Sequence, residues 1–326
     1  MAPTTSSSTS SSASVPTAGP APSTTRGPAP RRAGRGRRAS LDVMGWGFVL
    51  PFVVVFVVFS VVPAAMALFL SLTDIGIRDL TSPFAVDVVG LGNYASILGS
   101  EDFQRAMLNT ALFVVVGVPV TMGAGFVLAL ALDSGIRRMR SVFRAIVYVP
   151  VIANVVAAAV LWQYAFTQQG PVNGFLGALG VDGPNWLGRP GWAVVAVLLL
   201  TVWRNIGTCM VLFLAGLQSV PEEVHEAAAL DGAGYWRRVT AMTVPLLRPT
   251  TLLVSVLMSV SFLNIFDEPY LVTNGGPLSA TTSVAKWVYD QFGYGRIADS
   301  MAGSMVLLVV VLVVSTAQVR LLRSKH

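Results

Sequence analysis

Long apolar runs separated by short polar segments dominate the chain. Each run is long enough to cross a hydrocarbon core of about 30 Å, which takes roughly 20 helical residues. The runs occupy about 45–71, 107–132, 145–167, 192–217, 246–266 and 302–322. Backbone groups in lipid must be hydrogen-bonded within their own segment, and the period-two alternation of an outer-membrane barrel is missing. The pattern therefore predicts an all-α integral membrane protein with six transmembrane helices.

The composition agrees with this class and limits the chemistry. Hydrophobic residues make up 54% of the chain and charged residues 12%, too few charges to cover a soluble globule. Cys209 is the single cysteine, and His225 and His326 are too few and too far apart for a metal cluster. No Ser-His-acid set is present, and neither lysine follows the spacing of a phosphate-binding loop. We expect no metal site, no catalytic residue and no ATPase site in this chain.

The cationic residues divide unevenly between the two ends of the predicted spans. Lys and Arg accumulate in cytoplasmic loops, and most of them here fall in one set of segments: Arg26, Arg31, Arg32, Arg35, Arg37, Arg38, Arg137, Arg138, Arg140, Arg144, Arg237, Arg238, Arg248, Arg320, Arg323 and Lys325. The opposite set carries Arg78, Arg105, Arg189, Lys286 and Arg296. This asymmetry predicts that both termini and the loop at 218–245 are cytoplasmic. It also explains the net charge of +6 without a nucleic-acid partner.

The first 40 residues differ from the rest of the chain. They consist mainly of Ser, Thr, Pro, Ala and Arg, with almost nothing apolar to bury. Such a composition cannot offset the entropy of ordering. We expect residues 1–40 to form a disordered cytoplasmic tail and residues 41–326 to form a six-helix membrane domain.

A polar, helix-forming segment interrupts the apolar pattern at about 218–245. Acidic residues gather in its opening turns, where the helix dipole favours them. Gly232 is expected to adopt the left-handed backbone conformation that ends this helix. A second short helix is expected from about Tyr235 to Met242, with Pro245 and Pro249 turning the chain into the fifth span.

This polar segment is better suited to a protein partner than to a lipid surface. Amphipathic helices on membranes usually carry Lys and Arg on their polar face, whereas residues 219–231 carry acidic residues and neither Lys nor Arg. Ala227 and Ala228 have small side chains that keep the surface flat, so another protein's backbone can approach closely. The segment is therefore interpreted as a docking surface.

Two short motifs in this segment carry a family resemblance. Glu226-Ala227-Ala228, followed by Gly232 and by Met242-Thr243-Val244-Pro245, resembles the Glu-Ala-Ala loop of membrane subunits of ATP-binding-cassette importers. The family usually has Ile-x-Leu-Pro where this chain has Met-x-Val-Pro. The resemblance implies that the loop fits into a cleft of a cytoplasmic ATPase. The implied coupling residues are Glu222, Glu223, Glu226, Ala227, Ala228, Asp231, Gly232, Ala233 and Pro245.

Further segments resemble carbohydrate-importer permeases, a group that includes the larger maltose-permease subunit and glycerol-phosphate, lactose and trehalose permeases. These segments are Gly90 to Tyr94, Asn109-Thr110, Gly170 to Asn173, Leu214 to Gln218 and Thr273 to Pro277. The resemblance implies a multi-pass protein of a prokaryotic cytoplasmic membrane. The implied partners are a second homologous permease subunit, a cytoplasmic ATPase dimer, an extracytoplasmic solute-binding protein and the bilayer. ATP and Mg²⁺ are then used by the ATPase, and this chain binds no cofactor.

The end of the fifth span offers candidates for contact with a solute. A sugar needs amide or carboxylate partners and aromatic surfaces facing an aqueous cavity. On a continuous helix, Phe262 and Phe266 are four residues apart and share a face, while Asn264 points elsewhere. The resemblance to the maltose permease implies Asn264 as the best single candidate. The alternative is that both phenylalanines pack against neighbours and Asn264 makes an interhelical hydrogen bond.

Arg204 lies near the centre of the fourth span, where a charged residue costs roughly 2.5–3.5 kcal/mol on insertion scales. It is expected to face the bundle interior or a cavity. Trp203, Arg204 and Asn205 are therefore candidates for the solute pathway, although Arg204 suits a structural ion pair or a gate equally well.

Three other functions remain compatible with the sequence. An importer permease for a non-sugar solute shares the Glu-Ala-Ala loop. An ion-coupled secondary transporter usually carries inverted repeats and several ionisable residues at mid-membrane depth, and neither feature is evident here. A membrane scaffold could recruit a cytoplasmic enzyme through 218–245 without moving any solute.

Overall fold

The computed structural model describes residues 49–81, 86–134, 139–221, 223–224, 232 and 234–323. The chain divides into two units, Met1–Ser60 and Val61–His326. Regular structure in the described part is helical, and its one β-bridge joins Thr73 to Val88. The all-α prediction is confirmed for these residues. The predicted tail at 1–40 lies outside them.

Four helices are long and apolar enough to cross a membrane. They are Val49–Leu70, Glu101–Asp133, Pro190–Gln218 and Ile297–Leu321. The first contains η1 (Val57–Val61) and α2 (Val62–Leu70), and the second contains α4 (Glu101–Leu112), η3 (Phe113–Gly117) and most of α5 (Val118–Ser134). The last two correspond to α9 (Pro190–Gln218) and α15 (Ile297–Arg323). They coincide with four of the six predicted spans.

The predicted span at 145–167 is two helices, α6 (Arg140–Ile152) and α7 (Val155–Ala165), bent by 95°. Asn154 causes the break, because its extended backbone and side chain begin a new helix. Asn154 Oδ1 accepts from the amides of Val156 at 2.9 Å and Ala157 at 3.3 Å. This is the usual action of an asparagine N-cap.

The predicted span at 246–266 is also interrupted. A first helical stretch joins α11 (Tyr235–Arg238), η4 (Val239–Thr243) and α12 (Val244–Leu246), and it bends by 71° into α13 (Arg248–Leu263). The first helix therefore continues past Met242, and the turn falls at Leu247 rather than at Pro245. Counting each bent pair as one span, the described helices allow up to six.

The expectation of a continuous helix to residue 266 is wrong, because α13 ends at Leu263. Helical structure resumes in the segment that contains η5 (Pro269–Thr273). Pro269 has no amide to donate to the carbonyl of Ile265, as a continuous helix would require. That carbonyl instead accepts the hydroxyl of Ser283 at 2.5 Å. Phe262 and Phe266 therefore lie on different segments and share no helical face.

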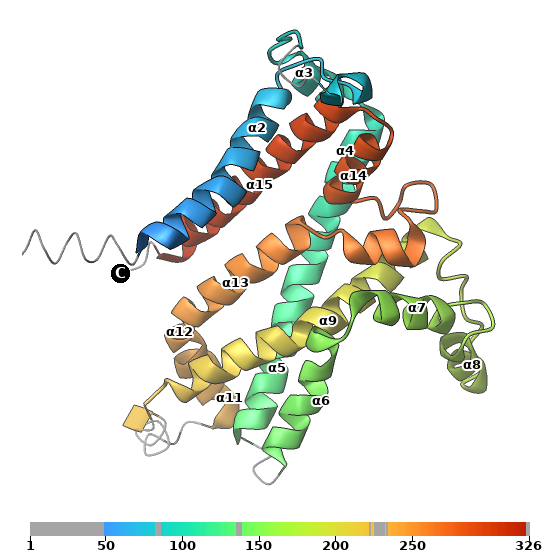
Figure 1. Cartoon of the computed structure of the whole chain (residues 1–326). Helices are drawn as coiled ribbons and strands as arrows, with labels where there is room; N and C mark the ends of the chain where they lie inside the picture. Colours follow the sequence, from blue (N-terminus) through green and yellow to red (C-terminus); the bar gives the residue numbers. More distant parts are fainter. Residues whose placement is uncertain are drawn as a thin grey trace, which may run out of the picture. The chain divides into compact units, whose positions relative to one another are not determined.

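The core of the second unit is built around the crossing of α5 and α9 (Figure 1). Gly125 allows the approach, since a Cβ there would lie 2.5 Å from Cys209 Cβ and 3.1 Å from the Met210 amide nitrogen. Such close contacts through small residues are typical of membrane helix pairs, whose stability depends on packing rather than on the hydrophobic effect. Leu200, Met210 and Phe213 are buried beside the crossing.

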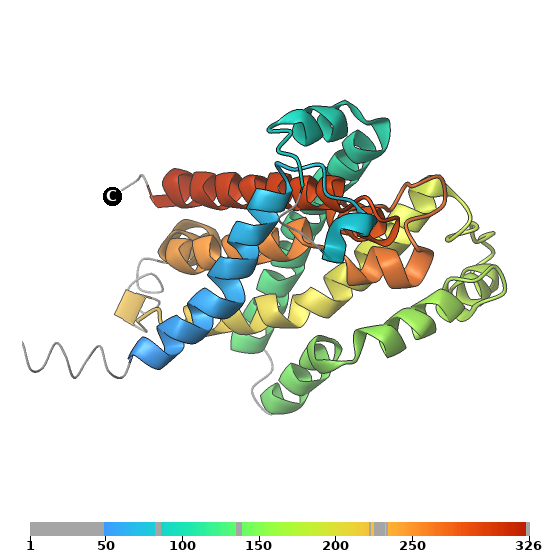
Figure 2. The same ribbon diagram turned by 45° about the horizontal axis from the view of Figure 1, so that its top comes forward.

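Short helices complete the second unit. They are η2 (Ile77–Thr81), α3 (Gly92–Gly99), α8 (Pro171–Ala178) and α14 (Val284–Gly293). A separate apolar cluster forms where α14 meets α4 and α15, and in it the rings of Phe103 and Trp287 meet edge to face at 4.7 Å. In Figure 2 the green segments α6, α7 and α8 follow one another, and the red α15 lies beside the orange α13, which it contacts.

Candidate functional site

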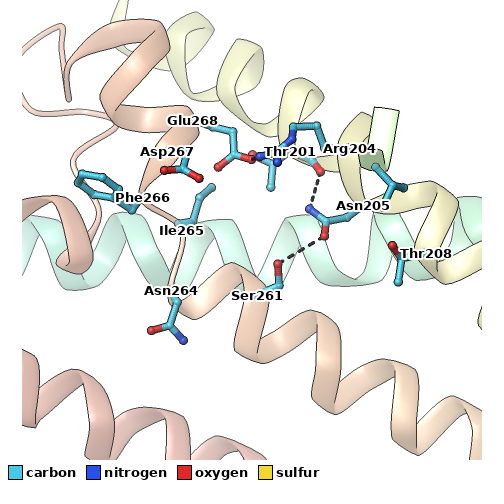
Figure 3. Close-up of a pocket in the computed structure, with 11 residues that line it drawn as sticks. Thr201, Arg204, Asn205, Thr208, Ser261, Asn264, Ile265, Phe266, Asp267 and Glu268 are labelled. Atoms are coloured by element: carbon cyan, nitrogen blue, oxygen red, sulfur yellow. Dashed lines mark hydrogen bonds and ion pairs between the residues drawn. The ribbon is translucent and has the colours of Figure 1, made fainter. Parts of the chain in front are cut away.

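A cavity of about 280 Å³ lies between α9, the end of α13 and the segment that follows α13 (Figure 3). Its wall is mostly polar, although the helices that form it are mostly apolar. The lining residues are Val151, Thr201, Arg204, Asn205, Thr208, Ser261, Asn264, Ile265, Phe266, Asp267 and Glu268. Irregular backbone at membrane depth is tolerated where it is buried in protein or lines a cavity, and the break after Leu263 satisfies this rule.

An ion pair between α9 and the segment after the break lies in the cavity wall. Arg204 Nη1 is 2.6 Å from Glu268 Oε1, and the two side chains are only 22% and 7% exposed. The position of Arg204 on the cavity agrees with the prediction that a charge at this depth faces the interior. Its partner was missed, because Glu268 is remote in sequence and nothing in the apolar pattern indicates which acid approaches α9.

Amide and hydroxyl groups continue the polar wall along α9 and α13. Asn205 Nδ2 donates to the Thr201 carbonyl at 2.9 Å, and Ser261 Oγ donates to Asn205 Oδ1 at 3.4 Å. The second bond is long and therefore weak. Figure 3 shows Asn205 and Ser261 pointing toward one another across the cavity. Asn205 follows the predicted candidate Arg204 directly, whereas Thr208 had no role in the sequence-based interpretation, since a single polar residue in a span is ambiguous.

Asn264 and Phe266, both predicted candidates, line the cavity. Asn264 caps the end of α13, and its Nδ2 donates to the Val260 carbonyl at 2.9 Å. Figure 3 shows Phe266 beside Asp267, on the side of the cavity away from Thr208. Asp267 is exposed and makes no ion pair with another described residue. The cavity therefore offers an amide, a carboxylate and an aromatic surface.

Two other predicted pathway residues do not line the cavity. Phe262 is fully buried in the core, where its ring packs against Gly117. Trp203 packs against Trp162 with ring centroids 5.1 Å apart. Neither side chain reaches the cavity in this arrangement, and both serve packing here.

The predicted coupling loop is described only in part. Glu223 is exposed and helical, Gly232 has a φ of 72°, and Pro245 lies in α12. The left-handed backbone expected at Gly232 is therefore present. The remaining coupling residues lie outside the described residues: Glu222, Glu226, Ala227, Ala228, Asp231 and Ala233. Within the described ranges, no group of three or more His, Cys, Asp or Glu residues is arranged to hold a metal ion.

Comparison with known proteins shows the family. Residues 117–324 match the binding-protein-dependent transport system inner membrane component family. The lactose transport system permease protein LacF of Rhizobium radiobacter is 33% identical over 282 residues, covering 83% of this chain and 92% of the relative. The trehalose/maltose transport system permease protein MalF of Thermococcus litoralis is 33% identical over 270 residues, covering 82% and 90%. The chain belongs to this family of ABC-importer permeases, and its resemblance to the carbohydrate-uptake type is confirmed.

Solved structures show the same fold. A bacterial ABC transporter involved in the import of the acidic polysaccharide alginate matches with a TM-score of 0.75 at 22% identity, covering 89% of this chain and 98% of that chain. The bacterial alginate transporter in complex with an alginate pentasaccharide-bound periplasmic protein matches with a TM-score of 0.74 at 22% identity, covering 87% and 95%.

Family membership decides several of the open alternatives. The chain is a multi-pass inner-membrane protein and a permease subunit, a class without ATPase activity of its own. An ion-coupled secondary transporter and a scaffold that moves no solute are both set aside.

Proposed function

We propose that this chain forms one half of the translocation pathway of an ATP-driven, binding-protein-dependent sugar importer. The observation that carries the proposal is the polar cavity at the interrupted end of α13. Hydroxyl groups of a sugar would bind to Asn264, Asn205 and Asp267, and an apolar ring face would contact Phe266. The names of the relatives, which include permeases for lactose and for trehalose or maltose, support the same solute class.

The size of the cavity supports a shared pathway. Its volume of about 280 Å³ is just below the ~300–1,000 Å³ that is typical of ligand pockets. A second homologous permease subunit would supply the opposite wall. Arg204 and Glu268 would hold the interrupted segment against α9 and so keep the wall in shape.

Glycerol phosphate is a second candidate solute, because a relative from Agrobacterium fabrum is named an sn-glycerol-3-phosphate permease and is 31% identical over 288 residues. A phosphate would need an available cation. Arg204 is already paired with Glu268, so its charge is balanced within the wall. This pairing favours a neutral sugar over an anion.

Six spans, with each bent pair counted as one, and cytoplasmic termini fit the distribution of cationic residues. In this topology residues 1–40 form a cytoplasmic tail, and the loop at 218–245 of the 41–326 permease domain contacts the ATPase. ATP and Mg²⁺ would be used by that ATPase dimer alone. A loaded extracytoplasmic binding protein would favour one conformation of the permease pair through its differential affinity for the two states.

The test is ATP hydrolysis and sugar uptake in lipid vesicles that hold this chain, its second permease and the ATPase. Glu226→Ala and Gly232→Ala are expected to uncouple the ATPase from the loaded binding protein. A Cβ at Gly232 is strained because its φ is 72°, at a cost of about 1 kcal/mol. Gly234→Ala is the matched control, since the φ of Gly234 is −64°.

The panel of solutes is lactose, trehalose, maltose and sn-glycerol 3-phosphate, each with its binding protein. Stimulation by one loaded sugar-binding protein, reduced several-fold in Gly232→Ala and retained in Gly234→Ala, is the expected result. Uptake of glycerol phosphate but of no sugar would overturn the sugar assignment. If Glu226→Ala and Gly232→Ala both retain coupling as Gly234→Ala does, the coupling role of the loop is overturned.

A further inference from the structure

Three aromatic side chains form a mutually contacting group beside the polar cavity. This aromatic cluster consists of Phe266, Tyr270 and Tyr289. Phe266 and Tyr270 are stacked, with centroids 5.2 Å apart and planes inclined by 12°. Tyr289, from α14, approaches Phe266 at 5.2 Å and Tyr270 at 5.3 Å. Each ring therefore contacts the other two.

The cluster borders open space, unlike the aromatic pairs of the core. Tyr289 is 51% exposed, and Phe266 is half-buried. Phe266 and Tyr289 line a hollow of about 380 Å³ between α14 and α15, which we call the α14 hollow. Phe266 also lines the polar cavity. This one ring is therefore a wall common to both spaces.

A buried lysine and its acidic partner support the cluster at Tyr270. Lys286 Nζ lies 5.7 Å from the centre of the Tyr270 ring and is held there by Asp290 at 2.7 Å. A hydrogen bond with the Tyr270 side chain raises the pKa of Tyr289 above its ordinary value. Tyr270 thus supports the cluster, while Tyr289 is the ring that a solute can reach.

We propose that the aromatic cluster is a second sugar subsite, which stacks a pyranose ring beside the polar cavity and passes it to the cavity across Phe266. The inference rests on the proposed function and adds a second position to the pathway. A flat aromatic surface with a hydroxyl donor at its edge matches the apolar face and the ring hydroxyls of a sugar. Continuity through Phe266 favours a sugar over lipid headgroups, which also attract tyrosine at membrane interfaces.

The test uses the reconstituted importer and uptake of radiolabelled lactose, trehalose and maltose. Tyr289→Ala is expected to lower uptake by about 3- to 10-fold, which is the usual effect of one aromatic contact. Tyr289→Phe and Tyr289→Trp keep a ring and should retain uptake within about twofold. Tyr294→Ala is the matched control, because Tyr294 follows the same helix, is 75% exposed and does not line the α14 hollow.

Two further readouts separate the subsite from a structural role. Recovery of the second permease on purification and stimulation of the ATPase by the loaded binding protein should be unchanged in Tyr289→Ala. Loss of the second permease would mean that the cluster is a subunit contact, and a defect that changes with headgroup composition would mean a lipid contact. Equal uptake by Tyr289→Ala and Tyr294→Ala would also overturn the proposal. If wild type takes up none of the sugars, the proposed function itself has failed, which is a distinct result.

Discussion

The α5–α9 crossing is built from continuous helices, whereas the α13–η5 junction is built around an interruption of the helix. At the crossing, two unbroken stretches of helix approach through Gly125, and the contacts are apolar and buried. At the junction, the helix ends at Leu263. The residues that follow place an amide and carboxylate side chains on the cavity, and the backbone carbonyl of Ile265 accepts the hydroxyl of Ser283. One region supplies a rigid frame, and the other supplies the chemistry that the frame holds.

The largest effect is expected at the ion pair between Arg204 and Glu268, which attaches the junction to α9. Glu268→Ala leaves the Arg204 charge largely buried without its partner and should lower the free energy of unfolding by about 3 kcal/mol. A lower thermal midpoint of the detergent-purified complex would report the loss. Asp267→Ala is the control, because Asp267 lines the same cavity but is exposed, and its effect should be below about 0.5 kcal/mol. Equal effects of the two changes would mean that the ion pair does not stabilise the junction.

A change at the helix crossing tests the frame itself. Gly125→Leu forces a side chain against Cys209 and the Met210 backbone, and it should cost about 2 kcal/mol through overpacking. The measurement is again the thermal midpoint, together with the yield of folded protein. Gly123→Leu is matched in residue type and helix, and a Cβ at Gly123 meets no atom within 4 Å. A frame that tolerates both substitutions would contradict close packing at this crossing.

The smallest effect is expected at Asn264, where function and stability should separate. Asn264→Ala removes one polar group from the cavity and should lower sugar uptake about fivefold, equivalent to about 1 kcal/mol for one hydrogen bond. The thermal midpoint should hardly change, because the end of α13 is exposed at this residue. Leu257→Ala, on an exposed position of the same helix outside the cavity, controls for truncation. A fall in stability that matches the fall in uptake would assign Asn264 a structural role.

The interruptions show which parts of the fold the sequence could not specify clearly. The apolar pattern correctly located helices at each predicted span, and the depth of Arg204 correctly placed it on a cavity. Asn154 lies inside the apolar run at 145–167, which continues past it, and the run at 246–266 continues past the end of α13 at Leu263. Hydropathy averages over about 20 residues and therefore does not register a single cap or a missing amide.

The candidate site was predicted in part for a related reason. Asn264 and Phe266 line the cavity, but Phe262, which is four residues from Phe266, is buried against Gly117 because the helix ends between the two phenylalanines. Spacing assigns faces only while the helix is continuous. Tyr289 and Glu268 were missed because their partners are on other segments.

The sequence by itself determined the membrane class, the helical architecture and the family, because apolar length and local motifs are properties of contiguous residues. Tertiary structure alone decided which polar residues meet: Glu268 with Arg204, Ser261 with Asn205, and Tyr289 with Phe266. These pairs come from segments that are distant along the chain. They form because α13 packs against α9 while α14 packs against α4 and α15, and no local pattern encodes these contacts.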